Sequence, residues 1–247
     1  MWPLANIETR KQIKDTSLLF WTLILPIGSI ILLIELFTTD DSSQKTLVAS
    51  QSVTGMSIFF STFVIISIVI SFVKDREKGI VSRLASTPMK PYNYFLGKSI
   101  PFFIIIISQI ALLTLLGVYL YDIEITQYWA FLLVIFLLSL LVTSWGVAIA
   151  VFSKTENTGL VMTNIIALGT AVVCGLWTPF DQLPSYLQTI GMIFPQYWAH
   201  QGLINYVSTL PGGEDLLPVV LVLIGYSVLG FIVSLIGHRR YIKMARS

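Results

Sequence analysis

The sequence predicts an all-α membrane protein with six transmembrane helices. Three observations support this fold class: apolar runs long enough to cross a bilayer, a low charge content, and the sorting of basic residues to one side. Of the 247 residues, 55% are hydrophobic and 11% are charged, whereas a typical soluble domain is about 25% charged. No connection between the runs is long enough for a soluble domain, so we expect a single membrane domain over residues 1–247.

Six apolar runs define the predicted spans. Each is near or above the roughly 18–20 residues that cross a hydrocarbon core about 30 Å thick. The runs are Leu18–Phe37, Leu47–Val73, Ser99–Leu120, Tyr128–Phe152, Leu160–Trp177 and Leu216–Ile236. The first run is too long for the apolar core of a cleavable signal peptide. An even number of spans leaves both termini on one side.

The basic residues predict the orientation. With six spans, fourteen of the fifteen Lys and Arg residues lie on the side of the termini, and Lys45 alone lies opposite. Because cytoplasmic loops collect Lys and Arg, we expect a multi-pass protein of the cell membrane with both termini in the cytoplasm. The basic residues sit at helix ends beside lipid headgroups, which favours membrane lipid over nucleic acid as a partner.

Residues 1–16, before the first span, are predicted to form a short interfacial helix on the cytoplasmic leaflet. Leu4, Ile7 and Lys11 share a helical stripe, and Trp2 lies nearby. Tryptophan and amphipathic helices favour the membrane–water interface. The alternative is a weakly ordered tail.

The cytoplasmic connection, residues 74–98, begins as a predicted helix that continues out of the membrane. It carries alternating charges, then small residues, and stops at Pro88, since proline interrupts a helix. Two interpretations remain: a solvated charged loop, or a docking element through which a cytoplasmic partner protein transmits motion.

The external connection, residues 178–215, is predicted to be a re-entrant helical hairpin. Its prolines end or start helices, and they separate two aromatic-rich segments that are too short to span. Backbone at membrane depth must be hydrogen-bonded internally or packed on protein, which favours helices over a partly exposed loop. The candidate residues of an external gate here are Gly175, Pro179, Pro184, Pro195 and Trp198.

No catalytic or metal centre is predicted. Cys174 is the only cysteine, and the two histidines, His200 and His238, are expected on opposite sides. Gly97-Lys98-Ser99 is similar to the end of a P-loop. However, Tyr92 stands where that loop needs its first glycine, and the segment enters a span instead of following a strand.

The connection after the second span resembles the signature of ABC type-2 transporter permeases. The matching residues are Arg76-Glu77-Lys78-Gly79, Leu84, Thr87-Pro88 and Gly97-Lys98. The stretch from Gly175 to Gln188, followed by Phe194-Pro195, is similar to the family's segment after span five. The resemblance covers nearly the whole chain. Ile80-Val81-Ser82-Arg83 departs from the family, which often has Thr or Ser and then Glu there.

The resemblance implies the permease subunit of an ATP-driven exporter in a bacterial cell membrane. The chain would not be an enzyme by itself and would bind no cofactor. Two copies of a separate cytoplasmic ABC ATPase would use ATP and Mg, and a second permease, identical or homologous, would complete the assembly. The implied ATPase contacts are Arg76, Glu77, Lys78, Gly79, Arg83, Leu84, Thr87, Pro88, Gly97 and Lys98.

The predicted substrate is an amphipathic or lipidic molecule, such as a drug, antibiotic, lipid or membrane-active peptide, because the spans form an apolar seam without a charged cage. Candidate pathway residues are Glu35, Ser61 and Asn164, since polar groups within spans are often functional. Alternatively, Glu35 reaches water, and the others pack helices. The alternative functions are a non-transport immunity or sensor protein and an intramembrane enzyme. An intramembrane protease needs paired catalytic residues, and a sensor needs no docking connection.

Overall fold

The computed structural model describes residues 2–38, 42–85, 91–207 and 215–246, and the regular structure of these residues is entirely helical. The elements are α1 (Trp2–Ile13), α2 (Thr16–Leu19), the π-helix η1 (Phe20–Ile24), α3 (Leu25–Phe37), α4 (Ser42–Glu77), α5 (Ile80–Ala85), α6 (Pro91–Tyr121), α7 (Tyr128–Phe152), α8 (Glu156–Val173), the 3-10 helix η2 (Phe180–Gln182), α9 (Ser185–Gly191), α10 (Pro195–Val207) and α11 (Leu216–Arg246). The predicted all-α fold class is confirmed.

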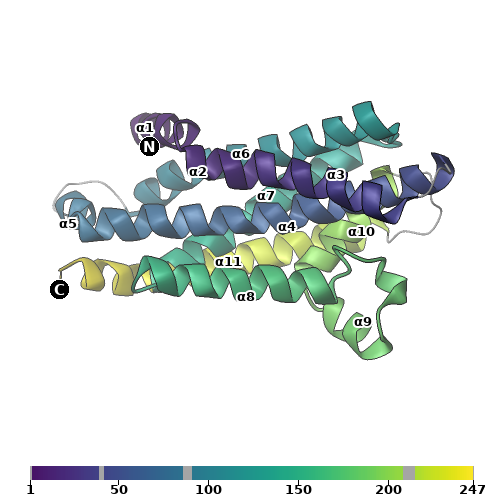
Figure 1. Cartoon of the computed structure of the whole chain (residues 1–247). Helices are drawn as coiled ribbons and strands as arrows, with labels where there is room; N and C mark the ends of the chain where they lie inside the picture. Colours follow the sequence, from purple (N-terminus) through teal and green to yellow (C-terminus); the bar gives the residue numbers. More distant parts are fainter. Residues whose placement is uncertain (1, 39–41, 86–90, 208–214, 247) are drawn as a thin grey trace.

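Five helical stretches in the described part of the chain are long and apolar enough to cross a membrane. They are Phe20–Phe37, Lys45–Glu77, Asn93–Tyr121, Tyr128–Phe152 and Leu216–His238. The remaining predicted span, Leu160–Trp177, falls on α8, which begins with the polar Glu156 and Asn157 and is not among the five. Because α8 nevertheless runs beside α4 along the bundle (Figure 1), the six-span topology stays a prediction.

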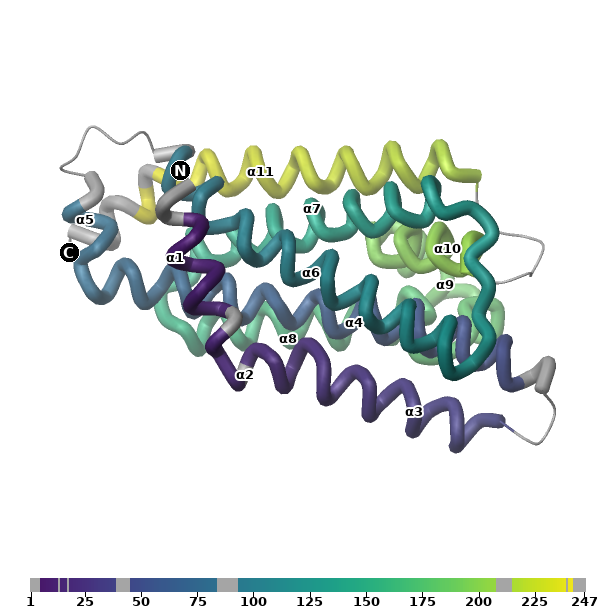
Figure 2. Tube along the Cα trace, turned by 90° about the horizontal axis from the view of Figure 1, so that it is seen from above, coloured from purple at the N-terminus to yellow at the C-terminus, as the bar shows by residue number. Residues whose placement is uncertain are grey.

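The two ends of the bundle carry different elements. Both termini and α5 lie at one end, which we call the basic end (Figure 1). Helices α9 and α10 lie at the other, which we call the hairpin end. Helix α1 crosses the bundle direction at the basic end (Figure 2). The cytoplasmic assignment of the basic end and the interfacial position of α1 stay predictions from charge and composition.

Helices α4 and α7 form the centre of the bundle. In their apolar windows 78% and 72% of residues are buried, against 22–33% for the other three candidate spans. Small residues allow close approach: a Cβ built on Gly230 of α11 would lie 2.6 Å from the Ser144 hydroxyl of α7. This close packing of small residues is typical of helix contacts in membranes. The outer helices therefore surround a rigid central pair, and α4 leads directly toward α5.

Candidate functional site

Helix α5 projects from the basic end on a glycine turn. Gly79 has φ of 67°, which glycine adopts without steric penalty. Its N–H donates to the carbonyl of Arg76 at 3.1 Å, and its own carbonyl accepts from the N–H of Arg83 at 3.2 Å. The predicted continuous helix is thus broken after Glu77, and α5 starts in a new direction. Figure 1 shows α5 at the tip of α4.

The predicted coupling residues divide into exposed and buried groups. The exposed ones are Glu77, Lys78 and Arg83, with Gly79 partly exposed. Arg76, Gly97 and Lys98 are buried. The backbone of Leu84 lies in α5, while Thr87 and Pro88 lie outside the described residues. The exposed group is therefore accessible at the basic end, while Arg76 and Lys98 of the buried group bond to neighbouring helices.

Lys98 of α6 is completely buried and bonded to α4. Its ammonium donates to the carbonyl of Ser71 at 3.0 Å, forms an ion pair with Asp75, and lies 5.3 Å from the ring centroid of Phe72. A buried charge needs such partners because leaving water is costly for it. Lys98 therefore fastens α6 to the last turns of α4, residues 71–77, which we call the terminal segment of α4.

Glu8 of α1 contacts the same terminal segment of α4. Its side chain is buried, and it accepts hydrogen bonds from the Ser71 hydroxyl at 2.6 Å and the Gln12 amide at 2.8 Å. It also pairs with Lys11 at 3.3 Å. Burial by itself raises the pKa of Glu8, but Lys98, the Ser71 hydroxyl and the other partners outweigh burial and hold that pKa below its ordinary value of 4.5.

Helices α7 and α11 complete the connections of the terminal segment. The Arg76 guanidinium donates to the carbonyl of Ser153 at 2.8 Å and to that of Lys154, where α7 ends. The Tyr241 hydroxyl of α11 donates to the carbonyl of Phe72 at 2.8 Å. Tyr94 of α6 adds a hydrogen bond to Asp75 at 3.0 Å. Four helices are therefore bonded to the segment that leads into α5.

Several members of this network were not predicted from the sequence. Glu8, Asp75, Tyr94 and Tyr241 were not candidates. One available signal was spacing: Ser71 and Asp75 are four residues apart, as are Glu8 and Gln12, so each pair shares a helix face. The spacing does not show which helix each of these faces contacts.

At the hairpin end, the structure has two short helices that begin at prolines of the predicted hairpin. Pro184 caps the start of α9, and Pro195 is the first residue of α10. Gly175 has φ of 68°, and its carbonyl accepts from the Gln51 side chain at 2.8 Å. The indole N–H of Trp198 donates to the carbonyl of Met192 at 2.8 Å. Membrane insertion and gating by these helices stay predictions.

A pocket of about 650 Å³ lies beside this end. It is bounded by α3, α4, residues 177–182 and α10, and the predicted gate residue Pro179 is part of its lining.

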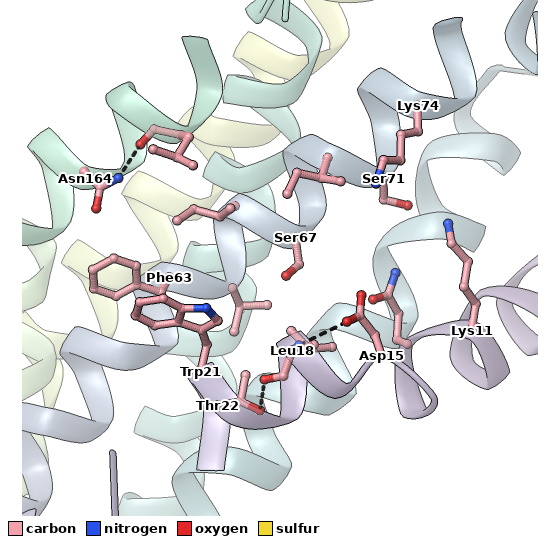
Figure 3. A pocket seen from close by; sticks show the side chains of 15 residues that line it. Lys11, Asp15, Leu18, Trp21, Thr22, Phe63, Ser67, Ser71, Lys74 and Asn164 are labelled. Carbon is pink, nitrogen blue, oxygen red and sulfur yellow. Dashed lines mark hydrogen bonds between the residues drawn. The ribbon is translucent and has the colours of Figure 1, made fainter. Parts of the chain in front are cut away.

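The three predicted pathway residues lie apart. Glu35 is exposed near the hairpin end and pairs with Lys45 at 3.4 Å. Ser61 is fully buried, and its hydroxyl donates to the carbonyl of Ile58 at 2.7 Å. Asn164 of α8 lines a pocket of about 470 Å³ toward the basic end, between the α1–η1 region and α4 (Figure 3). Among the three, Asn164 is the one that faces this pocket.

Comparison with known proteins decides the family. The family described as "ABC-2 family transporter protein" matches residues 33–236. The chain belongs to this family. It is 25% identical to the putative transport permease YvfS of Bacillus subtilis over 231 residues, which cover 92% of each protein. Membership makes it a multi-pass transport permease of a bacterial membrane, a kind of subunit that is not catalytic itself, and it implies an ABC ATPase partner and a permease dimer.

Two further relatives match over shorter parts. The linearmycin resistance permease protein LnrN of Bacillus subtilis is 26% identical over 181 residues, which are 73% of this chain and 47% of LnrN. The probable multidrug ABC transporter permease YbhR of Escherichia coli is 25% identical over 129 residues, 51% of this chain and 34% of YbhR. The chain therefore spans about half of LnrN and about a third of YbhR.

Proposed function

We propose that the chain is the membrane subunit of an ATP-driven exporter that moves an amphipathic or lipidic substrate out of the cytoplasm or inner leaflet. Two copies of a cytoplasmic ATPase bind ATP and Mg, and this chain binds no cofactor. A second permease, identical or homologous, pairs with it. The observation that carries the proposal is the exposed charged group at the basic end: Glu77 and Lys78 at the end of the most buried helix and Arg83 on α5, which follows it.

In this proposal, α5 receives the movement of the ATPase. Glu77, Lys78 and Arg83 contact the partner, and the short turn at Gly79 passes the displacement to α4. Close-packed interiors transmit strain because they have little free volume. The bonds of Arg76 and Lys98 would then carry the displacement to α7 and α6.

The substrate class is supported by the relatives and by the pockets. LnrN is named for linearmycin resistance, and YbhR is named as a probable multidrug transporter. The two pockets lie along α4, one toward each end of the bundle. A path between them, opened by the two permeases moving against each other and closed outside by the hairpin, suits an amphiphile better than a small hydrophilic ion.

The test reverses two exposed charges near the turn. We expect Glu77→Lys with Arg83→Glu to insert and fold normally but to reduce co-purification with the ATPase subunit and substrate-dependent ATP hydrolysis by tenfold or more. Lys154→Gln is the matched control, because this exposed residue lies at the same end and offers Arg76 its backbone carbonyl. Normal assembly together with normal transport in the double variant would overturn the coupling assignment.

A further inference from the structure

The pocket near the basic end has the size of a ligand site. Its volume of about 470 Å³ falls within the roughly 300–1,000 Å³ typical of pockets for drug-sized molecules. It lies between three separate elements: the α1–η1 region, α4 and α8 (Figure 3). It contains Asn164, the predicted pathway residue, together with Ser67 and Ser71.

One end of this pocket is cationic. Figure 3 shows Lys11 and Lys74 at the same end, beside Ser71. Lys74 is exposed, and among the described residues no carboxylate lies within ion-pair distance of it. Lys11 pairs with Glu8 at 3.3 Å, and an ammonium has three donors. The lining carboxylate, Asp15, accepts the backbone N–H of Leu18 at 3.2 Å. Two ammonium groups therefore face a single acidic lining residue.

The other end is apolar and aromatic. The rings of Trp21 and Phe63 stack with centroids 6.0 Å apart and planes 18° apart, so they form an aromatic pair in the lining. Trp21 is 46% exposed although it lies within the first candidate span. Leu18, Ile70 and Leu160 extend the apolar lining. Such a lining suits a hydrocarbon chain.

We propose that this pocket binds an anionic single-chain amphiphile, with its phosphate or carboxylate between Lys11 and Lys74 and its chain along Trp21 and Phe63. A neutral molecule would leave Lys74 without a counter-charge, and a free anion would leave the apolar part of the pocket unfilled. Hydrogen bonds to charged groups are stronger than neutral ones, so the headgroup sets the selectivity. As the entry site of the transported molecule, this inference rests on the proposed function; as a binding site it stands alone.

The experiment measures binding to the purified full chain in a neutral detergent. The probe is lysophosphatidylglycerol with a brominated acyl chain, which quenches tryptophan fluorescence on contact. Lysophosphatidylcholine with the same chain and glycerol phosphate without a chain are the comparison ligands. We expect the anionic lysolipid to bind at least tenfold more tightly than either. Equal affinity for the two lysolipids would overturn the proposal.

Variants locate the site. Lys11→Gln with Lys74→Gln should weaken binding of the anionic probe about tenfold, the size of one hydrogen bond to a charged group, and leave lysophosphatidylcholine unchanged. Lys14→Gln with Lys154→Gln is the matched control, because both lysines are exposed and neither lines the pocket. Unchanged selectivity in the first pair would overturn the headgroup assignment.

A second variant keeps the test decisive if the lysine variants fold poorly. Leu160→Trp fills the apolar part from a partly exposed position on α8 and should weaken binding of both lysolipids. Unchanged binding there would place the chain elsewhere. If the unmodified chain assembles with its ATPase but does not distinguish the two lysolipids, the ligand assignment fails and the proposed function stands. If the unmodified chain binds the anionic lysolipid selectively but does not assemble with an ATPase, the proposed function fails and the ligand assignment stands.

Discussion

At the basic end, buried side chains of opposite charge join the helices, whereas at the hairpin end glycines let the backbones touch. Lys98, Glu8 and Asp75 connect α6 and α1 to α4. In contrast, a Cβ on Gly55 of α4 would collide with the backbone carbonyl of Leu176, and one on Gly191 with that of Val173. The basic end is stabilised by ionised groups that need their partners. The hairpin end is stabilised by close backbone contacts that are possible only where glycine has no side chain.

This difference bears on how each end moves. A buried polar network is stable when all its members are satisfied, and it is costly when one is removed. Ion pairs also act over longer distances than van der Waals contacts, so an ionic connection tolerates a small displacement of the terminal segment of α4. Under the proposed function, transmission belongs to the basic end and opening to the hairpin end.

The largest expected effect comes from breaking the ionic end at its centre. Lys98→Met leaves Asp75 and Glu8 without their buried counter-charge and should destabilise the fold by about 3–5 kcal/mol, the size measured when one partner of a buried pair is removed. Thermal unfolding in detergent measures it. The matched Lys45→Met removes an exposed pair and should cost less than about 1 kcal/mol. Equal losses would contradict the distinction between the ends.

Acidification should destabilise the hairpin end first and the basic end at lower pH. His200 of α10 is buried at the hairpin end, and burial lowers its pKa from 6.5 to about 4. The unfolded state therefore binds a proton on His200 at a higher pH than the folded state does. As the pH falls from 6.5 toward 4, the free energy of unfolding decreases by on the order of 3 kcal/mol. The pKa of Glu8 is also depressed, so its contribution is lost below about pH 4.5.

Unfolding midpoints measured from pH 7.5 to well below pH 4 test this order. His200→Leu should remove the first decline, and Glu8→Gln should remove the later one. A single decline that neither variant alters would show that other groups control the acid response.

The next largest loss of stability is expected from disturbing the close backbone packing at the hairpin end. Gly55→Ala places a Cβ against the carbonyl of Leu176, and the overpacking should cost about 1–3 kcal/mol because the contact is with backbone. Gly28→Ala on α3 is the control, since no atom lies within 4 Å of its Cβ position, and alanine favours a helix by about 1 kcal/mol over glycine. If both variants behaved alike, close backbone packing would not hold this end.

The same contrast explains what the sequence could predict. The candidate spans and the proline-bounded helices α9 and α10 follow from local properties: hydropathy, and the limits that Pro184 and Pro195 set on helices. The permease family was predicted from the resemblance around Arg76 and Gly79, and the family match confirms it; membership in turn implies an ABC ATPase partner. These features required no knowledge of which helices meet.

Other features depended on packing and were missed. Lys98 was predicted to contact a partner protein, yet it is buried against Asp75, because the register of α6 against α4 is not encoded in either segment alone. Gly79 was included in one helix running to Pro88, although its positive φ ends α4. The pocket that contains Asn164 needs three separate elements, and sequence spacing cannot bring those together.

The smallest expected effect concerns Glu35, the acidic group within the first predicted span. It pairs with Lys45 at 3.4 Å, but its side chain is 61% exposed, so water screens the pair. Glu35→Gln should therefore cost about 0.2–1 kcal/mol, and less in high salt, and should leave transport within twofold. Transport by reconstituted complex and thermal stability at two salt concentrations measure both. A tenfold fall in transport with unchanged stability would place Glu35 in the pathway. Compared with Lys98→Met, this variant isolates desolvation, because each removes one charge from an ion pair and the pairs differ in their exposure to water.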